Sequence, residues 1–298
     1  MRYKYFICDV FTHQRFNGNQ LAVLPDAQGL SERQMQAIAK EFNFSETTFV
    51  FPPEYGHTRK VRIFTPTTEV PFAGHPNIGT AFALANEGLF GDLKETMEVI
   101  FEEKAGLVPV SIILDSSDQI WCELAAPEPL SIGNSVPAGM VAKSLSLSEG
   151  DIVTDIHPPE AASVGLPFLF VEIASVSALQ IVQINTIELD KLVKEGVPSY
   201  IHLYCRRVED FDIRARMFAP LDGVFEDPAT GSANCALIAL LTHYDSASDS
   251  DYKWSISQGT EIGRPSVLYG RTQKRNGIIT GVWIGGNSVL VSEGTLHI

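Results

Sequence analysis

The chain has 298 residues, of which 45% are hydrophobic, and a formal net charge of −14. A chain of this length can bury two cores, so about two domains are expected. The dispersed acidic surface repels nucleic-acid phosphates and anionic membranes, and no apolar run reaches the roughly 18 residues of a membrane span. We therefore expect a soluble, cytoplasmic protein with neither nucleic acid nor a membrane as its partner.

Short strand-like runs dominate the first half of the chain. A capping box at Ser31–Gln34 predicts an amphipathic helix to about Phe42, and a nearly uncharged helix is expected over about 76–88. The predicted strands cover 5–11, 20–24, 47–51, 60–64, 97–101, 107–114 and 120–124.

The second half shows the same pattern of short strand-like runs. It follows a candidate linker at 125–135, which is rich in Pro, Ser and Gly. Helices are expected over 188–194 and about 229–243. The predicted strands cover 168–174, 200–205, 213–218, 254–257, 277–283 and 288–292. This pattern predicts an α+β protein of two lobes, 1–125 and 126–285, each a barrel-like set of strands around a central helix. A ligand would bind in the cleft between the lobes.

An internal repeat supports the two-lobe interpretation. Residues 64–66 (Phe-Thr-Pro) and 76–81 (Pro-Asn-Ile-Gly-Thr-Ala) recur as 218–220 (Phe-Ala-Pro) and 228–233 (Pro-Ala-Thr-Gly-Ser-Ala). Each copy leads into an apolar stretch typical of a buried helix. Proline suits the first helical turn, and the small residues leave the first N–H groups open to an anion such as a carboxylate. Two ordinary proline-capped core helices without a ligand are the alternative.

Two side chains could perform acid–base chemistry at these helix starts. His75 precedes Pro76, and Asp227 precedes Pro228, so the two residues would be equivalent if the prolines superpose. An imidazole and a carboxylate facing one ligand form a suitable acid–base pair. Taken singly, His75 could be a core or capping histidine, and Asp227 a simple N-cap.

Glu46 is a third candidate, at the start of an apolar strand. Burial raises the pKa of a carboxyl, which suits a base that shuttles a proton. The spacing leaves open the alternative that Glu46 points into solvent.

Four ordered motifs together resemble the PhzF, or phenazine biosynthesis-like, family. They are 11–19, 45–47, 64–76 and 226–232. The resemblance implies a diaminopimelate-epimerase-like fold, in which the C-terminal strand at 286–298 rejoins the first lobe. It also implies a homodimer and an isomerase of the dihydrohydroxyanthranilate type that needs neither metal nor cofactor.

The resemblance assigns roles to single residues. It implies that Glu46 is the acid/base, with His75 and Asp227 as its partners. The residues that would bind the small carboxylate substrate are Gly74, Pro76, Gly231 and Ser232.

Related racemases and epimerases place one cysteine at each helix start, whereas this chain has Ala73-Gly74 and Asp227-Pro228 at those places. Its four cysteines, Cys8, Cys122, Cys205 and Cys235, lie in apolar runs without CxxC spacing, which is typical of buried packing residues in a reducing compartment. A two-thiol racemase is therefore disfavoured. A non-catalytic protein that binds a small acid is the second hypothesis.

Overall fold

The computed structural model describes residues 1–93, 95–114, 119–208 and 210–298. The chain divides into two compact units: Met1–Ala125 with Gly285–Ile298 (unit 1), and Ala126–Ile284 (unit 2). Both units combine helices with strands, so the expected α+β class is confirmed. In the described part of the chain, no helix is long and apolar enough to cross a membrane.

Unit 1 is a closed ring of strands around a helix. Successive pairings join β1 to β2, β3, β4, β6, β7, β8 and finally β18, which pairs with β1 again. The helix α2 (Gly74–Asn86) packs against β1, β2, β3, β7 and β8, so it lies inside this ring. The strands are β1 (Arg2–Val10), β2 (Asn19–Leu24), β3 (Glu46–Phe51), β4 (Arg59–Phe64), β5 (Glu69–Val70), β6 (Thr96–Glu103), β7 (Gly106–Leu114), β8 (Ile120–Ala125) and the C-terminal part of β18 (Ile278–His297).

The amphipathic helix α1 (Glu32–Phe42) covers β3 and β4. Its capping box is confirmed: the Ser31 side chain accepts a hydrogen bond from the Gln34 N–H, and the Gln34 side chain accepts one from the Ser31 N–H. Met35, Ile38 and Ala39 form its buried face.

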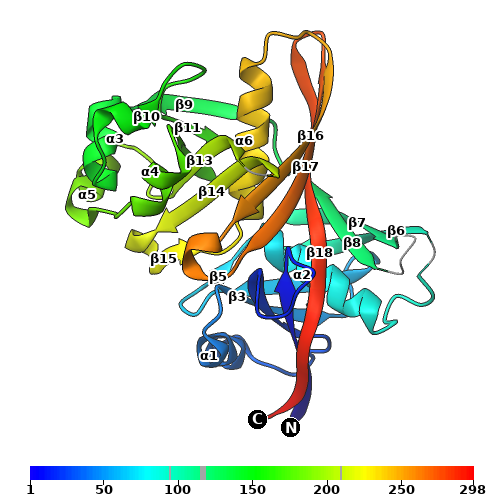
Figure 1. Ribbon diagram of the computed structural model, residues 1–298. Helices are drawn as coiled ribbons and strands as arrows, with labels where there is room; N and C mark the ends of the chain where they lie inside the picture. Colours follow the sequence, from blue (N-terminus) through cyan, green and yellow to red (C-terminus); the bar gives the residue numbers. More distant parts are fainter. Residues whose placement is uncertain (94, 115–118, 209) are drawn as a thin grey trace. The chain divides into compact units, whose positions relative to one another are not determined.

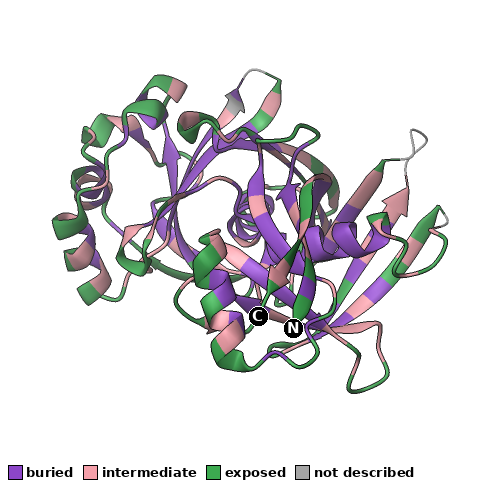
Figure 2. Cartoon of the chain, turned by 90° about the horizontal axis from the view of Figure 1, so that it is seen from below, coloured by how far each residue is buried: buried purple, intermediate pink, exposed green. Residues whose placement is uncertain are grey.

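Unit 2 also wraps strands around one helix. The helix α6 (Gly231–Tyr244) packs against β11, β12, β16 and β17, and nearly all of α2 and α6 is buried (Figure 2). Three further helices, α3 (Ala138–Leu145), α4 (Val176–Ile181) and α5 (Thr186–Lys194), share a second apolar cluster with β12 and β13. The strands are β9 (Ser131–Ser135), β10 (Ile152–Val153), β11 (Glu160–Ser163), β12 (Pro167–Ile173), β13 (Ile201–Val208), β14 (Phe211–Ala219), β15 (Val224–Asp227), β16 (Ser250–Gln258), β17 (Ser266–Arg275) and the start of β18.

Three expectations for the strands need correction. The linker candidate contains strand β9, which pairs with β11. The strand expected over 254–257 is the end of the longer β16. The two strands expected over 277–283 and 288–292 are one strand, β18, which runs beside β1 in unit 1 (Figure 1). A Cβ on Gly285 would stand 2.7 Å from the Cys122 carbonyl oxygen, so this glycine allows a close approach to β8 and does not form a turn.

The two units repeat one order of strand pairings. In unit 1, β2–β3 is parallel, β3–β4 and β4–β5 are antiparallel, β4–β6 is parallel and β6–β7 is antiparallel. In unit 2, β12–β13, β13–β14, β14–β15, β14–β16 and β16–β17 follow the same order with the same orientations. In each unit the central helix follows the short strand, β5 or β15, so this pairing order is the frame that places both helix starts.

Candidate active site

The helix α2 begins at Gly74, two residues before the expected start at Pro76. Its N-cap, Ala73, has no side chain that could accept a hydrogen bond from the first turn. Instead, Asn77 Nδ2 donates to the Ala73 carbonyl at 3.0 Å, so a side chain of α2 itself holds the N-cap residue in place. The first N–H groups of α2 therefore keep the partial positive charge of a helix N-terminus.

Glu46 faces this helix start. It is the first residue of β3, and it lies on the same face of the strand as Thr48, because side chains alternate along a strand. Thr48 Oγ1 lies 2.8 Å from Thr80 Oγ1 of α2. Glu46 Oε2 lies 3.5 Å from His75 Nε2, and the Glu46 side chain is only 19% exposed. The solvent-facing alternative for Glu46 is therefore wrong.

His75 is neutral at ordinary pH. Burial lowers the pKa of His75 to about 3, although a hydrogen bond to the Gln20 backbone partly opposes this shift. Asn19 Nδ2 lies 3.4 Å from His75 Nδ1. Because the imidazole is uncharged, its contact with Glu46 is not an ion pair, and the ring keeps one donor and one acceptor nitrogen.

A loop with strained backbone angles precedes Asn19 and positions it beside His75. Phe11 and Phe16 have positive φ angles of 63° and 72°, which side chains rarely adopt. The Phe16 N–H donates to the buried Asp9 carboxylate at 2.6 Å. At Gly18, with φ +68°, a Cβ would stand 2.3 Å from the Val10 carbonyl oxygen, so the close turn requires glycine.

The second helix start lies in unit 2 and is tightly hydrogen-bonded. The helix α6 begins at Gly231, not at the expected Ala229, with Thr230 as its N-cap. Thr230 Oγ1 donates to Asp227 Oδ2 at 2.6 Å. Asp227 ends β15 and is buried, so this hydroxyl fixes the orientation of its carboxylate.

Gln258, which the sequence analysis missed, organises this region. Its Nε2 donates to the Asp227 carbonyl at 2.8 Å and to Thr230 Oγ1 at 3.1 Å. Its Oε1 accepts from the Thr230 N–H at 3.2 Å and from Asn234 Nδ2 at 2.7 Å. Because the Thr230 hydroxyl accepts from Gln258, its own proton is directed to Asp227. A polar side chain directly before Gly259, at the buried end of a strand, was the available signal.

The structural register of the repeat differs from the proline match. Asn234 Nδ2 donates to the Thr230 carbonyl at 3.0 Å, as Asn77 does to Ala73. These bonds align Ala73 with Thr230, Gly74 with Gly231 and His75 with Ser232. Pro76 is the third residue of α2, whereas Pro228 lies before α6 begins. The expected equivalence of His75 with Asp227 is therefore wrong.

In this register the N-cap residues of the two central helices are Ala73 and Thr230, so neither N-cap is a cysteine. All four cysteines are buried, and Cys235 lies inside α6. Burial raises the pKa of the Cys205 thiol to about 12 and also raises those of Cys8 and Cys122.

Known proteins resemble this chain over its full length. The family model of the phenazine biosynthesis-like proteins matches residues 8–294. An uncharacterized isomerase of Mesorhizobium japonicum is 36% identical over 302 residues, covering 99% of this chain and 98% of its own. The trans-2,3-dihydro-3-hydroxyanthranilate isomerase of Pseudomonas aeruginosa is 32% identical over 296 residues, covering 99% and 100%.

The solved structures agree with this assignment. A phenazine biosynthesis protein of the PhzF family from Bacillus anthracis has a TM-score of 0.90 at 26% identity, and the match covers 100% of both chains. The chain therefore belongs to the phenazine biosynthesis-like (PhzF) family, and it is an isomerase.

Proposed function

We propose that the protein moves a proton between two carbons of a small carboxylate substrate, with Glu46 as the acid/base. One relative is named trans-2,3-dihydro-3-hydroxyanthranilate isomerase, and this name supports a cyclic or amino-acid-derived acid as the first candidate substrate. In this proposal Glu46 takes the proton as one C–H bond breaks, and the electron pair delocalises over the substrate. Glu46 then returns the proton to a second carbon, so nothing is oxidised and no cofactor is needed.

The contact between Glu46 and His75 is the observation that carries this proposal. A carboxyl and a neutral imidazole lie 3.5 Å apart beside the start of α2. Since no charge on His75 holds Glu46 in one state, the carboxyl can gain and lose a proton during turnover. His75 would orient Glu46 by donating to it or accepting from it.

The helix starts would hold the substrate. Backbone N–H groups at Gly74, Gly231 and Ser232 would bind the substrate carboxylate, with Pro76 as part of the wall. Asp227, fixed by Thr230 and Gln258, would act on the same substrate as the second polar group. The two-lobe arrangement with a cleft belongs to this proposal, and the homodimer and the cytoplasmic location stay predictions.

Two alternatives have less support. The buried cysteines with raised pKa values disfavour a two-thiol racemase, because only a thiolate is an effective base. A non-catalytic protein that binds a small acid is disfavoured by the contact between Glu46 and His75, because binding alone does not need a partly buried carboxyl next to a neutral imidazole.

Proton exchange tests the proposal directly. The protein is incubated with trans-2,3-dihydro-3-hydroxyanthranilate and related cyclic acids in deuterated water, and exchange is followed by NMR. We expect Glu46→Gln to lower the rate about 10²- to 10⁴-fold, because a general acid/base contributes that much. Glu41→Gln, which replaces an exposed residue on α1, is the matched control and should catalyse proton exchange at the wild-type rate.

Ligand binding separates the outcomes. Binding of 3-hydroxyanthranilate, the stable aromatic analogue, is measured by calorimetry for each variant. Retained binding with lost exchange supports Glu46 as the base. Exchange that survives in Glu46→Gln rules this role out, and binding without exchange of any acid in the wild type favours the non-catalytic alternative.

A further inference from the structure

Glu103 of unit 1 and Gln258 of unit 2 occupy the same position in the repeated frame. Each is the last residue of the strand that follows the central helix, β6 or β16. Glu103 follows Glu102, which pairs in parallel with Lys60 of β4, four residues before Phe64. Gln258 follows Ser257, which pairs in parallel with Arg214 of β14, four residues before Phe218.

The hydrogen bonding at these two positions differs. In unit 2, the Gln258 side chain donates a hydrogen bond through Nε2 to the Asp227 carbonyl, and its Oε1 accepts one from Asn234 Nδ2 at 2.7 Å. In unit 1, the Asn77 amide lies against the Glu103 carboxyl. Both Glu103 oxygens are buried, and neither has a hydrogen-bond partner within the described ranges. An ionised carboxylate in such a place would be costly, because the nearby Asn77 amide does not replace the hydration that burial removes.

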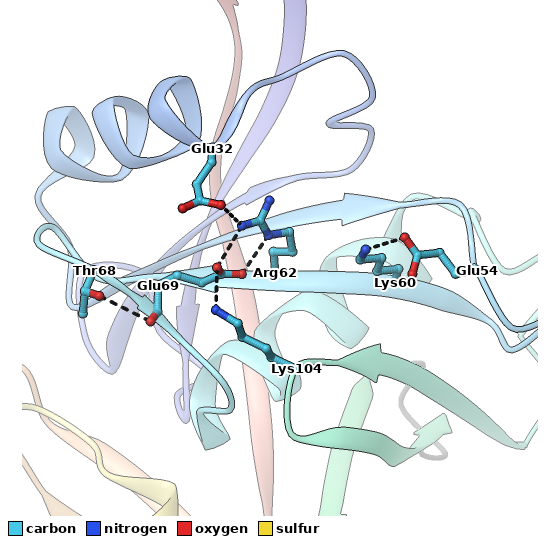
Figure 3. A network of polar contacts seen from close by, with 7 residues as sticks. All are labelled: Glu32, Glu54, Lys60, Arg62, Thr68, Glu69 and Lys104. Atoms are coloured by element: carbon cyan, nitrogen blue, oxygen red, sulfur yellow. Dashed lines mark hydrogen bonds and ion pairs between the residues drawn. The ribbon is translucent and has the colours of Figure 1, made fainter.

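The charged groups around Glu103 are already committed to other partners. In Figure 3, Arg62 of β4 donates hydrogen bonds to both Glu69 and Glu32. Lys104 donates to Glu69, and Lys60 donates to Glu54. The neighbouring Glu102 accepts backbone N–H groups of Glu54, Tyr55 and His57. The paired strand β7 carries no ionisable side chain, and His75 on α2 is neutral. Among the residues that the structure describes, we find no uncommitted cation beside Glu103 that would favour its ionised form.

We propose that Glu103 is a neutral carboxylic acid in the working enzyme, and that its ionisation weakens binding of the substrate carboxylate at the start of α2. A neutral carboxylic acid offers one donor and one acceptor, as the amide of Gln258 does. An ionised Glu103 would place a negative charge beside Asn77, within the first two turns of the helix whose N–H groups bind the substrate. This inference rests on the proposed function. Burial raises the pKa of Glu103 to about 8, although the Asn77 amide partly opposes the shift.

Binding of a carboxylate as a function of pH tests the coupling. The affinity for 3-hydroxyanthranilate is measured by calorimetry between pH 6.5 and 9.5. We expect the wild-type affinity to fall about tenfold, which corresponds to about one pKa unit of coupling between the two charges. Glu103→Gln should abolish most of this fall. Glu98→Gln, an exposed change on the same strand, should follow the wild type.

Melting curves without ligand test the ionisation separately. The folded-state pKa of Glu103 lies above the ordinary value of 4.5, so its contribution to stability is complete below pH 4.5 and is lost as pH rises from there to about 8. Between pH 5 and 8, the melting temperature should therefore fall less for Glu103→Gln than for the wild type and for Glu98→Gln.

The possible results exclude different parts of the proposal. Identical melting curves for Glu103→Gln and wild type would overturn the neutral carboxyl. A changed melting curve with an unchanged affinity profile would overturn the coupling. Absence of carboxylate binding at every pH would overturn the proposed function and the coupling with it, while the melting curves would still decide the protonation of Glu103.

Discussion

The starts of α2 and α6 share one backbone frame but differ in how completely their polar groups are satisfied. At α6, Gln258 and Asn234 form a continuous network that ends on Asp227. At α2, Asn77 Oδ1, His75 Nε2 and both Glu103 oxygens have no hydrogen-bond partner among the described residues. A satisfied buried network fixes geometry, whereas an unsatisfied one leaves room for a ligand or a proton. Asp227 is therefore held rigidly, and the proton chemistry is expected at α2.

Removing the glutamine at the end of β16 should have the largest effect. Gln258→Leu removes the Gln258 hydrogen bonds to the Thr230 N–H, the Asp227 carbonyl and an Asn234 N–H, and we expect a loss of about 3 kcal/mol in the free energy of unfolding. Glu103→Leu, the matched change in unit 1, removes only the contact with Asn77 and should cost much less. Urea unfolding measures both, and equal losses would contradict the difference between the two helix starts.

Exchanging small residues inside the two helices should have an intermediate effect. A Cβ on Gly79 would stand 2.5 Å from Leu21 Cδ2 and 2.6 Å from Val10 Cγ2, and the equivalent position in α6 is the buried Ala236. We expect Gly79→Ala to destabilise the protein by about 2 kcal/mol through overpacking, despite the higher helix propensity of alanine. Ala236→Gly should cost about 1 kcal/mol through propensity. A stabilised Gly79→Ala variant, measured by the same urea unfolding, would show that β1 and β2 can move away from α2.

The buried histidines should give the smallest effect at neutral pH, and one that grows as pH falls. Burial lowers the pKa of both His75 and His202 to about 3, below the unfolded value of 6.5. Their contribution to stability is therefore complete above pH 6.5 and is lost as pH falls, by about 1.4 kcal/mol per pH unit for each histidine. His202→Gln should remove about half of this loss between pH 6.5 and 5, because a glutamine does not titrate.

Chemical unfolding at each pH measures that slope. The Nε2 of His202 lies 3.1 Å from Asn234 Oδ1, and a glutamine amide can donate to the same oxygen. An unchanged slope in His202→Gln would show that the folded protein accepts the proton on His202.

The repeat and the amphipathic helix α1 could be predicted from the sequence because both depend on local residues. The register of the helix starts could not, because proline is favoured at the first helical position but tolerated throughout the first turn. Gln258 and Glu103 were missed for another reason. Their partners lie 24 and 26 residues away along the chain, and only the strand order brings them together.

The strand β18 has a consequence for how the protein is made. Its pairing with β1 joins Arg2 to His297, so the ring of unit 1 cannot close until the residues of β18 are synthesised. At typical translation rates, β1 waits roughly 15 to 60 s for its partner, while nearly all of unit 2 can leave the ribosome first. During that time, one edge of β1 has no paired strand, and the strands of unit 1 do not yet fully enclose the apolar surface of α2. We expect nascent chains that stop before residue 285 to bind chaperones or aggregate through unit 1, even where unit 2 has already folded.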